Sequence, residues 1–142
     1  ILFVAAGAFH AVRTSELAPE LQGRFPIRVE LSALGEEELC SILTELRGAL
    51  ISQYVALLAA DEVVLRFSPD ATCAVARCAY EANMAGENIG AERLRSVLYT
   101  LIEDVLFDAP AVPKRKIHIT NCYVSEKLGN YLEGEDLSRY AL

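Results

Sequence analysis

The chain has 142 residues, of which 53% are hydrophobic and 23% are charged, so it is long enough and apolar enough to fold around a core. Its formal net charge of −7 argues against a nucleic acid or an anionic membrane surface as the main partner. No run approaches the roughly 18 apolar residues of a membrane span. The basic run Lys114-Arg115-Lys116 is more typical of a solvated turn than of a phosphate clamp.

The apolar opening, Ile1 to Phe9, lacks the basic segment and cleavage site of a signal peptide. Since it also lacks an initiator Met, we expect the chain to begin within a longer protein.

The first part of the chain predicts two strands with a short helix between them. Residues 1–7 form a continuous apolar run, which is typical of a strand buried on both faces. Residues 15–22 predict a helix that is capped by Ser15 and stopped by Gly23. Residues 26–31 alternate as a second strand. Two buried strands need neighbours that this region does not supply, so we interpret it as the end of a larger α/β domain.

From residue 34 onward the pattern becomes helical. Helices are predicted over 36–46 and 49–60, and a short strand at 63–67 leads into Ser68-Pro69, a cap followed by proline at the first helical position. Two longer helices carry apolar residues at the three- and four-residue spacing of a core-facing stripe. These stripes are Ala71, Ala74, Val75, Cys78, Ala79 and Ala82, then Leu94, Val97, Leu98, Leu101, Ile102 and Val105.

A second short strand over 116–120 and a last helix over 123–132 complete the predicted fold. Its class is α/β, with strand-helix-strand remnants followed by a mostly helical domain that has two short strands. The four cysteines, Cys40, Cys73, Cys78 and Cys122, form no CxxC pair and predict no metal site. We interpret them as small buried hydrophobic residues of a reducing compartment.

Four stretches of the chain resemble HslU (ClpY), the AAA+ unfoldase ring of the HslVU protease. They read ILFVAAGAFH, ELQGRFPIRVELSAL, NIGAERLRSVL and, at the end, EDLSRYAL. The resemblance covers the whole chain but only the C-terminal portion of the family, whose phosphate loop and magnesium-binding strand lie upstream. It implies that residues 1–33 end a parallel-sheet AAA+ nucleotide-binding domain. Residues 34–142 would form the small domain, with a peptidase-docking tail at 133–142.

The resemblance assigns nucleotide chemistry to the helix that follows the first strand. Arg24 matches an arginine finger that is supplied to the ATP of a neighbouring subunit, where a planar cation stabilises charge on the transferred phosphoryl group. Glu20 matches a second position at the nucleotide. On the residues alone, Glu20 and Arg24 would be a helix-surface ion pair worth about 0.3–0.5 kcal/mol. Arg28 is either a second cation near the subunit boundary or an alternating surface residue.

Further nucleotide contacts are implied in the small domain. Ile42 matches an apolar contact with the adenine ring, although from the residues alone it is simply a core residue. Glu92 stands where the family has a cation that contacts the phosphates of the nucleotide. Three explanations stay open: the helix is rotated, Arg93 or Arg95 reaches the phosphates instead, or the subunit binds nucleotide poorly. Ala6 likewise replaces an expected hydroxyl in the first sensor strand. The cofactor implied is ATP with Mg²⁺, whose ligands are not in this chain, so the chain alone is predicted to be inactive as an ATPase.

The resemblance also implies a protein partner for the C-terminal end of the chain. In the family, the C-terminal tail inserts into the HslV peptidase and activates it, which would explain why apolar residues stand beside the terminal carboxylate. The implied contact residues are Leu137, Ser138, Arg139, Tyr140, Ala141 and Leu142. The resemblance further implies a homo-oligomeric ring, a hexamer, that takes unfolded proteins as substrates. Its compartment would be the bacterial cytoplasm or, in a eukaryote, the mitochondrial matrix.

Two alternative functions remain open on the sequence. One is another AAA+ unfoldase of the ClpX type, whose peptidase docks on loops of the large domain and needs no apolar C-terminus. The other is a non-enzymatic helical interaction module whose ending is captured by a PDZ-like groove through its free carboxylate.

Overall fold

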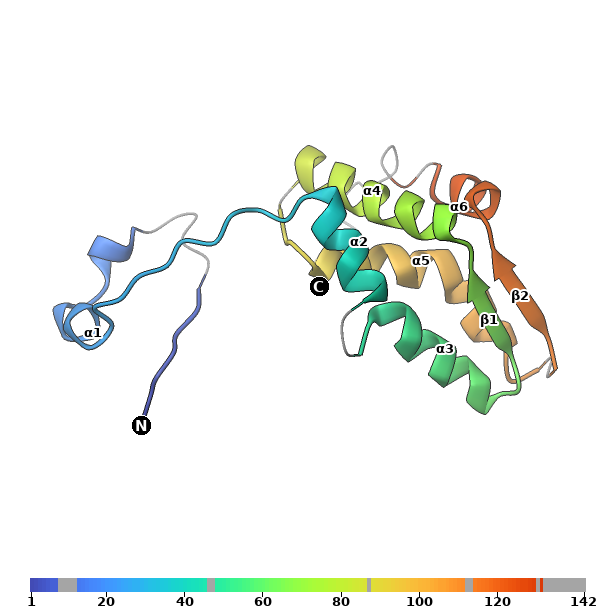
Figure 1. Cartoon of the computed structure of the whole chain (residues 1–142), viewed down its shortest axis with the longest axis horizontal. Coiled ribbons are helices and arrows are strands. Elements are labelled where there is room, and N and C mark those ends of the chain that lie inside the picture. Colours follow the sequence, from blue (N-terminus) through green and yellow to red (C-terminus); the bar gives the residue numbers. More distant parts are fainter. Residues whose placement is uncertain (8–12, 46–47, 87, 112–113, 130, 132–142) are drawn as a thin grey trace. The chain divides into compact units, whose positions relative to one another are not determined.

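Helices make up most of the structure, a computed structural model that describes residues 1–7, 13–45, 48–86, 88–111, 114–129 and 131 (Figure 1). The chain divides into two units, Ile1–Ser32 and Ala33–Leu142. The N-terminal unit contains the short 3-10 helix η1 (Thr14–Glu16) and α1 (Pro19–Arg24). The C-terminal unit contains α2 (Glu36–Thr44), α3 (Leu50–Ala60), β1 (Val64–Phe67), α4 (Pro69–Ala85), α5 (Glu92–Asp108), β2 (Lys116–Ile119) and α6 (Asn121–Leu128).

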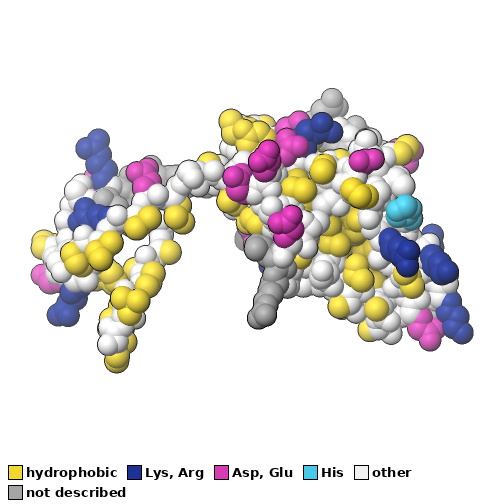
Figure 2. All heavy atoms as spheres, in the orientation of Figure 1, with side chains coloured by type: hydrophobic (Ala, Val, Ile, Leu, Met, Phe, Trp, Pro, Cys, Tyr) yellow, Lys and Arg dark blue, Asp and Glu magenta, His cyan; other side chains and the backbone are white. Residues whose placement is uncertain are grey.

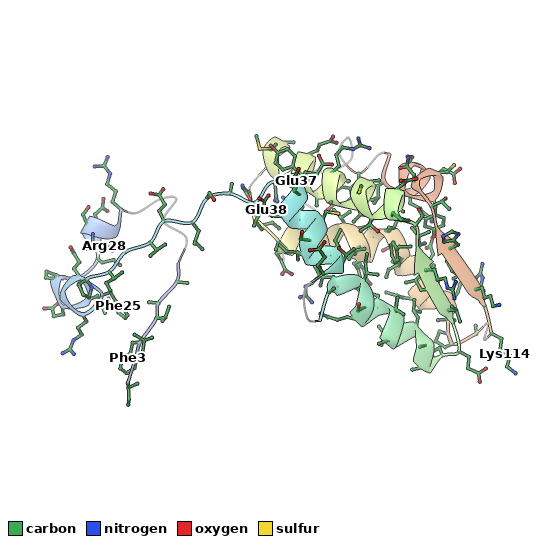
Figure 3. The ribbon with its side chains drawn as sticks, in the orientation of Figure 1. Phe3, Phe25, Arg28, Glu37, Glu38 and Lys114 are labelled. Carbon is green, nitrogen blue, oxygen red and sulfur yellow. The ribbon has the colours of Figure 1, made fainter. Side chains whose placement is uncertain are left out.

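The N-terminal unit lacks both strands that the sequence predicts. Neither 1–7 nor 26–31 is a strand in the structure, because a strand exists only by pairing and no described segment pairs with either of them. Figure 2 shows hydrophobic side chains along the surface of this unit, and Figure 3 labels Phe3 among them. The exposed set is Ile1, Leu2, Phe3, Val4, Leu21, Ile27, Val29 and Leu31.

The helix of the N-terminal unit is displaced from its predicted position. It begins at Pro19 rather than after Ser15, because proline already has the backbone angle of a first helical turn. It then runs through Gly23, which was expected to stop it, and ends at Arg24. Gln22 holds the preceding turn against the helix, since its side-chain amide donates to the carbonyl oxygens of Ser15 (3.0 Å) and Leu17 (2.7 Å).

The core of the C-terminal unit is built around α4 and α5. Helix α4 packs against α2, α5 and α6, and its start is fixed by Ser68, whose hydroxyl accepts a hydrogen bond from the Ala71 N–H at 3.2 Å. Both predicted stripes face this core, although Cys78 is only half-buried. The largest fully buried side chains are Leu39, Leu43, Leu58, Leu94, Leu98, Leu101, Ile102 and Ile119.

The two strands of the C-terminal unit form a parallel pair in the register Val64 with Lys116 through Phe67 with Ile119. Parallel neighbours need a long crossover connection, which α4 and α5 provide here. The predicted strands at 63–67 and 116–120 are therefore confirmed, each one residue shorter.

Helix α6 begins two residues earlier than expected. The hydroxyl of Thr120 accepts a hydrogen bond from the Tyr123 N–H at 3.4 Å and so caps the helix at its start.

The prediction that all four cysteines are buried is wrong, because Cys73 and Cys122 are exposed. Within the described part of the chain, no helix has both the length and the apolar character needed to cross a bilayer.

Candidate functional site

A hollow of about 210 Å³ lies in the C-terminal unit, where the residues between α2 and α3 meet the start of α5. Ile42 from α2 and Glu92 from α5 both line it, two residues for which the family resemblance implied a place at the nucleotide. They are 50 positions apart in the chain, so the fold brings together two candidates that arose from separate stretches of sequence. The complete lining is Ile42, Gly48, Ala49, Leu50, Ala91, Glu92 and Arg95.

The charge in this hollow comes from one acid and one cation. Arg95 Nε lies 3.2 Å from Glu92 Oε1, and both side chains are more than half exposed, at 56% and 63%. Of the arginines considered at this position from the sequence, Arg95 is the one that lines the hollow. Glu92 is therefore not the only charged residue at the hollow, because the negative charge of its carboxylate is balanced by the Arg95 guanidinium one helical turn away.

Arg93 has a different environment from its neighbours on α5. It is only 4% exposed, and its Nε donates to Asn83 Oδ1 at 3.4 Å. It is not among the residues that line the hollow. Adjacent helical residues point about 100° apart, so the helix that turns Glu92 outward turns Arg93 into the unit. In the structure Arg93 therefore contacts Asn83 of α4, and the nucleotide contact expected of it stays a prediction.

Asn83 organises the turn that precedes α5, and sequence reasoning did not identify it. Its Nδ2 donates to the Gly90 carbonyl oxygen at 3.0 Å, while its Oδ1 accepts from the Ile89 N–H at 3.2 Å and from Arg93 Nε. Gly90 has φ +62°, a conformation that glycine adopts without strain. The available signal in the sequence was an amide residue beside the apolar stripe of α4. A polar side chain that is buried there almost always has a hydrogen-bond partner.

Glu20 and Arg24 both lie on α1 and are exposed. Among the residues that the structure describes, no ion pair joins them, so the surface pairing considered from the sequence is not observed. Arg28, labelled in Figure 3, donates from Nη2 to Gln22 Oε1 at 3.3 Å. Ala6 is exposed. All of these residues belong to the N-terminal unit.

The six residues predicted to contact a peptidase lie outside the described residues. They are Leu137, Ser138, Arg139, Tyr140, Ala141 and Leu142.

The hollow is smaller than a typical ligand site. Ligand sites commonly measure about 300–1,000 Å³, so a space of about 210 Å³ accommodates only part of an ATP molecule. Ile42 and Leu50 offer apolar surface suited to a base, and Arg95 offers a cation suited to a phosphate. In the described parts of the chain, no group of three or more His, Cys, Asp or Glu residues could hold a metal ion. A complete nucleotide site would need residues from outside this unit.

No family model matches the chain. It is 51% identical over all 142 residues to the ATP-dependent protease ATPase subunit HslU of Syntrophomonas wolfei, and equally identical to the HslU subunits of Geobacillus kaustophilus and Enterococcus faecalis. The match covers 100% of this chain and 30% of each relative.

These relatives define a class of protein, the ATPase subunits of ATP-dependent proteases. Within that class, the chain is similar along its whole length to the C-terminal part of HslU, which confirms the resemblance expected from its motifs. The chain spans about 30% of the length of these relatives, so the activity of a whole subunit belongs to the proposal that follows.

Proposed function

We propose that the chain is the C-terminal part of an HslU-type unfoldase, an ATPase that forms a ring, activates an HslV-type peptidase and feeds it unfolded protein. The observation that carries the proposal is the 51% identity over a match that spans all 142 residues of the chain. The proposed compartment is the bacterial cytoplasm, or the mitochondrial matrix if the source is eukaryotic.

The exposed apolar segments of the N-terminal unit support its assignment to a larger AAA+ domain. Segments such as Ile1 to Val4 and the alternating Ile27, Val29 and Leu31 expose a large apolar surface. Strands buried on both faces have this composition, and apolar surface of this extent normally packs against other structure. Residues 1–33 would complete a parallel sheet of the nucleotide-binding domain, and residues 34–142 would be the small domain.

In this proposal the nucleotide is shared between domains and between subunits. Ile42 and Leu50 would contact the base, and Arg95 would contact the phosphates from the small domain. Arg24 would reach the nucleotide of the neighbouring subunit, where a permanently charged fork stabilises the charge that develops during phosphoryl transfer. Head-to-tail contacts of this kind close into rings, so the activity would depend on assembly.

The C-terminal ending would bind the peptidase. Burial of the Tyr140 and Leu142 side chains could each contribute about 1.5–3 kcal/mol before the cost of ordering the tail. The terminal carboxylate could add a charge-assisted hydrogen bond of about 1.5–3 kcal/mol. A single tail would bind weakly, but a ring that presents several copies gains affinity through effective concentration.

The test is ATP-dependent proteolysis by the complete protein together with its cognate HslV-type peptidase. We expect degradation of a folded substrate only when the complete protein, the peptidase and ATP are all present. If degradation requires a ClpP-type peptidase instead, the chain belongs to an unfoldase of the ClpX type. If ATP is not hydrolysed and the ending binds a PDZ-like domain, the non-enzymatic module is supported.

A further inference from the structure

A second hollow, of about 580 Å³, lies in the C-terminal unit at the N-terminal end of α2. It is lined by Gly35, the acidic first turn of α2, Cys40 and, from α4, Cys73. Figure 3 labels Glu37 and Glu38 at this end of α2. The first turn is held by Glu38, whose Oε2 accepts from the Gly35 N–H at 3.0 Å. Because α2 packs directly on α4, the two cysteines come from two helices in contact.

The two thiols differ in their environments. Cys73 is exposed and Cys40 is half-buried, and both are free in the structure. Burial raises the pKa of the Cys40 thiol, and the hydrogen bond and charge of the neighbouring Cys73 raise it further. Both side chains line the same hollow from two helices in contact, and Cys73, the exposed one, is the thiol that an oxidant in solution reaches more easily.

We propose that Cys40 and Cys73 are a peroxide-responsive pair whose disulfide links α2 to α4. The thiolate of Cys73 attacks one oxygen of a peroxide, the O–O bond breaks, and the cysteine becomes a sulfenic acid. Cys40 then loses its proton and attacks that sulfur, forming the S–S bond and expelling hydroxide, which takes up the proton as water. Two thiols are oxidised, and one hydrogen peroxide is reduced to two waters.

The other cysteines do not offer this arrangement. Cys78 lies on the same helix as Cys73, five residues along, which places the two side chains about 140° apart around the helix axis. Cys122 lies on α6, and its thiol donates to Glu126 Oε1 at 3.6 Å. Neither Cys78 nor Cys122 lines the hollow that holds the pair.

The bond would restrict a helix that also serves the candidate nucleotide site. Cys40 precedes Ile42 by two residues on α2, and α4 carries Asn83, which fixes the turn before α5. Oxidation would therefore join two elements that position the smaller hollow. The proposed bond itself does not depend on the nucleotide function, because it rests on the packing of α2 against α4.

The test is disulfide mapping of the complete protein after treatment with hydrogen peroxide. Remaining free thiols are alkylated, the protein is digested without reduction, and the peptides are identified by mass spectrometry. We expect one linked peptide pair that joins Cys40 to Cys73, lighter than the two reduced peptides by two hydrogens, and lost after treatment with dithiothreitol. The wild-type protein gives this readout, so it does not depend on whether a variant folds.

Cysteine variants test which two thiols form the disulfide. The double variant Cys78→Ser, Cys122→Ser should still form the bond, and Cys122→Ser alone is the matched control at an exposed thiol. Cys73→Ser should leave Cys40 free for alkylation after the same treatment. Oxidation of Cys73 to a sulfinic acid while Cys40 stays free, or links that join separate chains instead of one chain, would overturn the proposal.

Discussion

Arg95 Nε lies 3.2 Å from Glu92 Oε1 across one turn of α5, so the acid and the cation of the candidate nucleotide site neutralise each other. Both side chains are more than half exposed, and exposed pairs of this kind contribute only about 0.2–1 kcal/mol. The pair can therefore open at little cost. This relationship explains how a carboxylate can stand where the family resemblance places a cation without leaving the site acidic.

Removing the Glu92 charge should strengthen nucleotide binding. In Glu92→Gln, Arg95 loses its competitor for a phosphate, and we expect the affinity of the complete protein for ATP to rise about three- to tenfold, or roughly 0.7–1.4 kcal/mol. Glu92→Arg should raise it at least as much. Calorimetric titration with ATP measures the change, and Glu81→Gln, at an exposed acid on α4, is the matched control. An unchanged affinity in both Glu92 variants would mean that this side chain does not face the phosphates.

Arg24→Ala should abolish ATP turnover in the complete protein while ATP binding stays within about twofold. The reason is that an arginine finger stabilises the transition state in a neighbouring subunit and contributes little to the bound ground state. Turnover is measured by phosphate release and binding by titration, with Arg77→Ala, at an exposed arginine of α4, as control. Parallel loss of binding and turnover would instead assign Arg24 a structural role.

Asn83→Ala should lower the free energy of unfolding by about 1–3 kcal/mol, because it removes a buried or half-buried hydrogen bond from each of three groups. These groups are the Ile89 N–H, the Gly90 carbonyl and the Arg93 guanidinium. Asn88→Ala, which removes one exposed hydrogen bond to the Gly90 N–H, should cost clearly less. Denaturation in urea measures both. Equal, small losses would show that Asn83 does not hold the turn.

The helices of the C-terminal unit were predictable because local sequence and tertiary packing agree there. The stripe from Leu94 to Val105 has the spacing of a buried helix face, and Ser68 with Pro69 marks the start of α4. The predictions of strands at 1–7 and 26–31 were wrong because local sequence and tertiary packing do not agree there. An apolar run indicates what a segment can become, but pairing decides whether it is a strand, and no described segment pairs with these two.

The candidate site was only partly predictable. Ile42 and Glu92 came from the family resemblance, and the fold brings both to one hollow. The role of Asn83 was not predictable from spacing, because its partners lie across a turn whose shape depends on the positive φ of Gly90. The exposure of Cys73 was predictable from the sequence, because an apolar stripe marks the buried face of a helix and Cys73 stands outside that stripe.

The most direct test of the proposed function is peptide hydrolysis by the cognate HslV-type peptidase, measured with the complete protein ending at Leu142 and with the same protein lacking Leu142. Both should bind ATP equally, because the deletion leaves the candidate nucleotide residues intact. We expect strong activation by the intact protein in the presence of ATP, and loss of most of that activation when Leu142 is removed. Equal activation by the two proteins would contradict docking through the C-terminal ending.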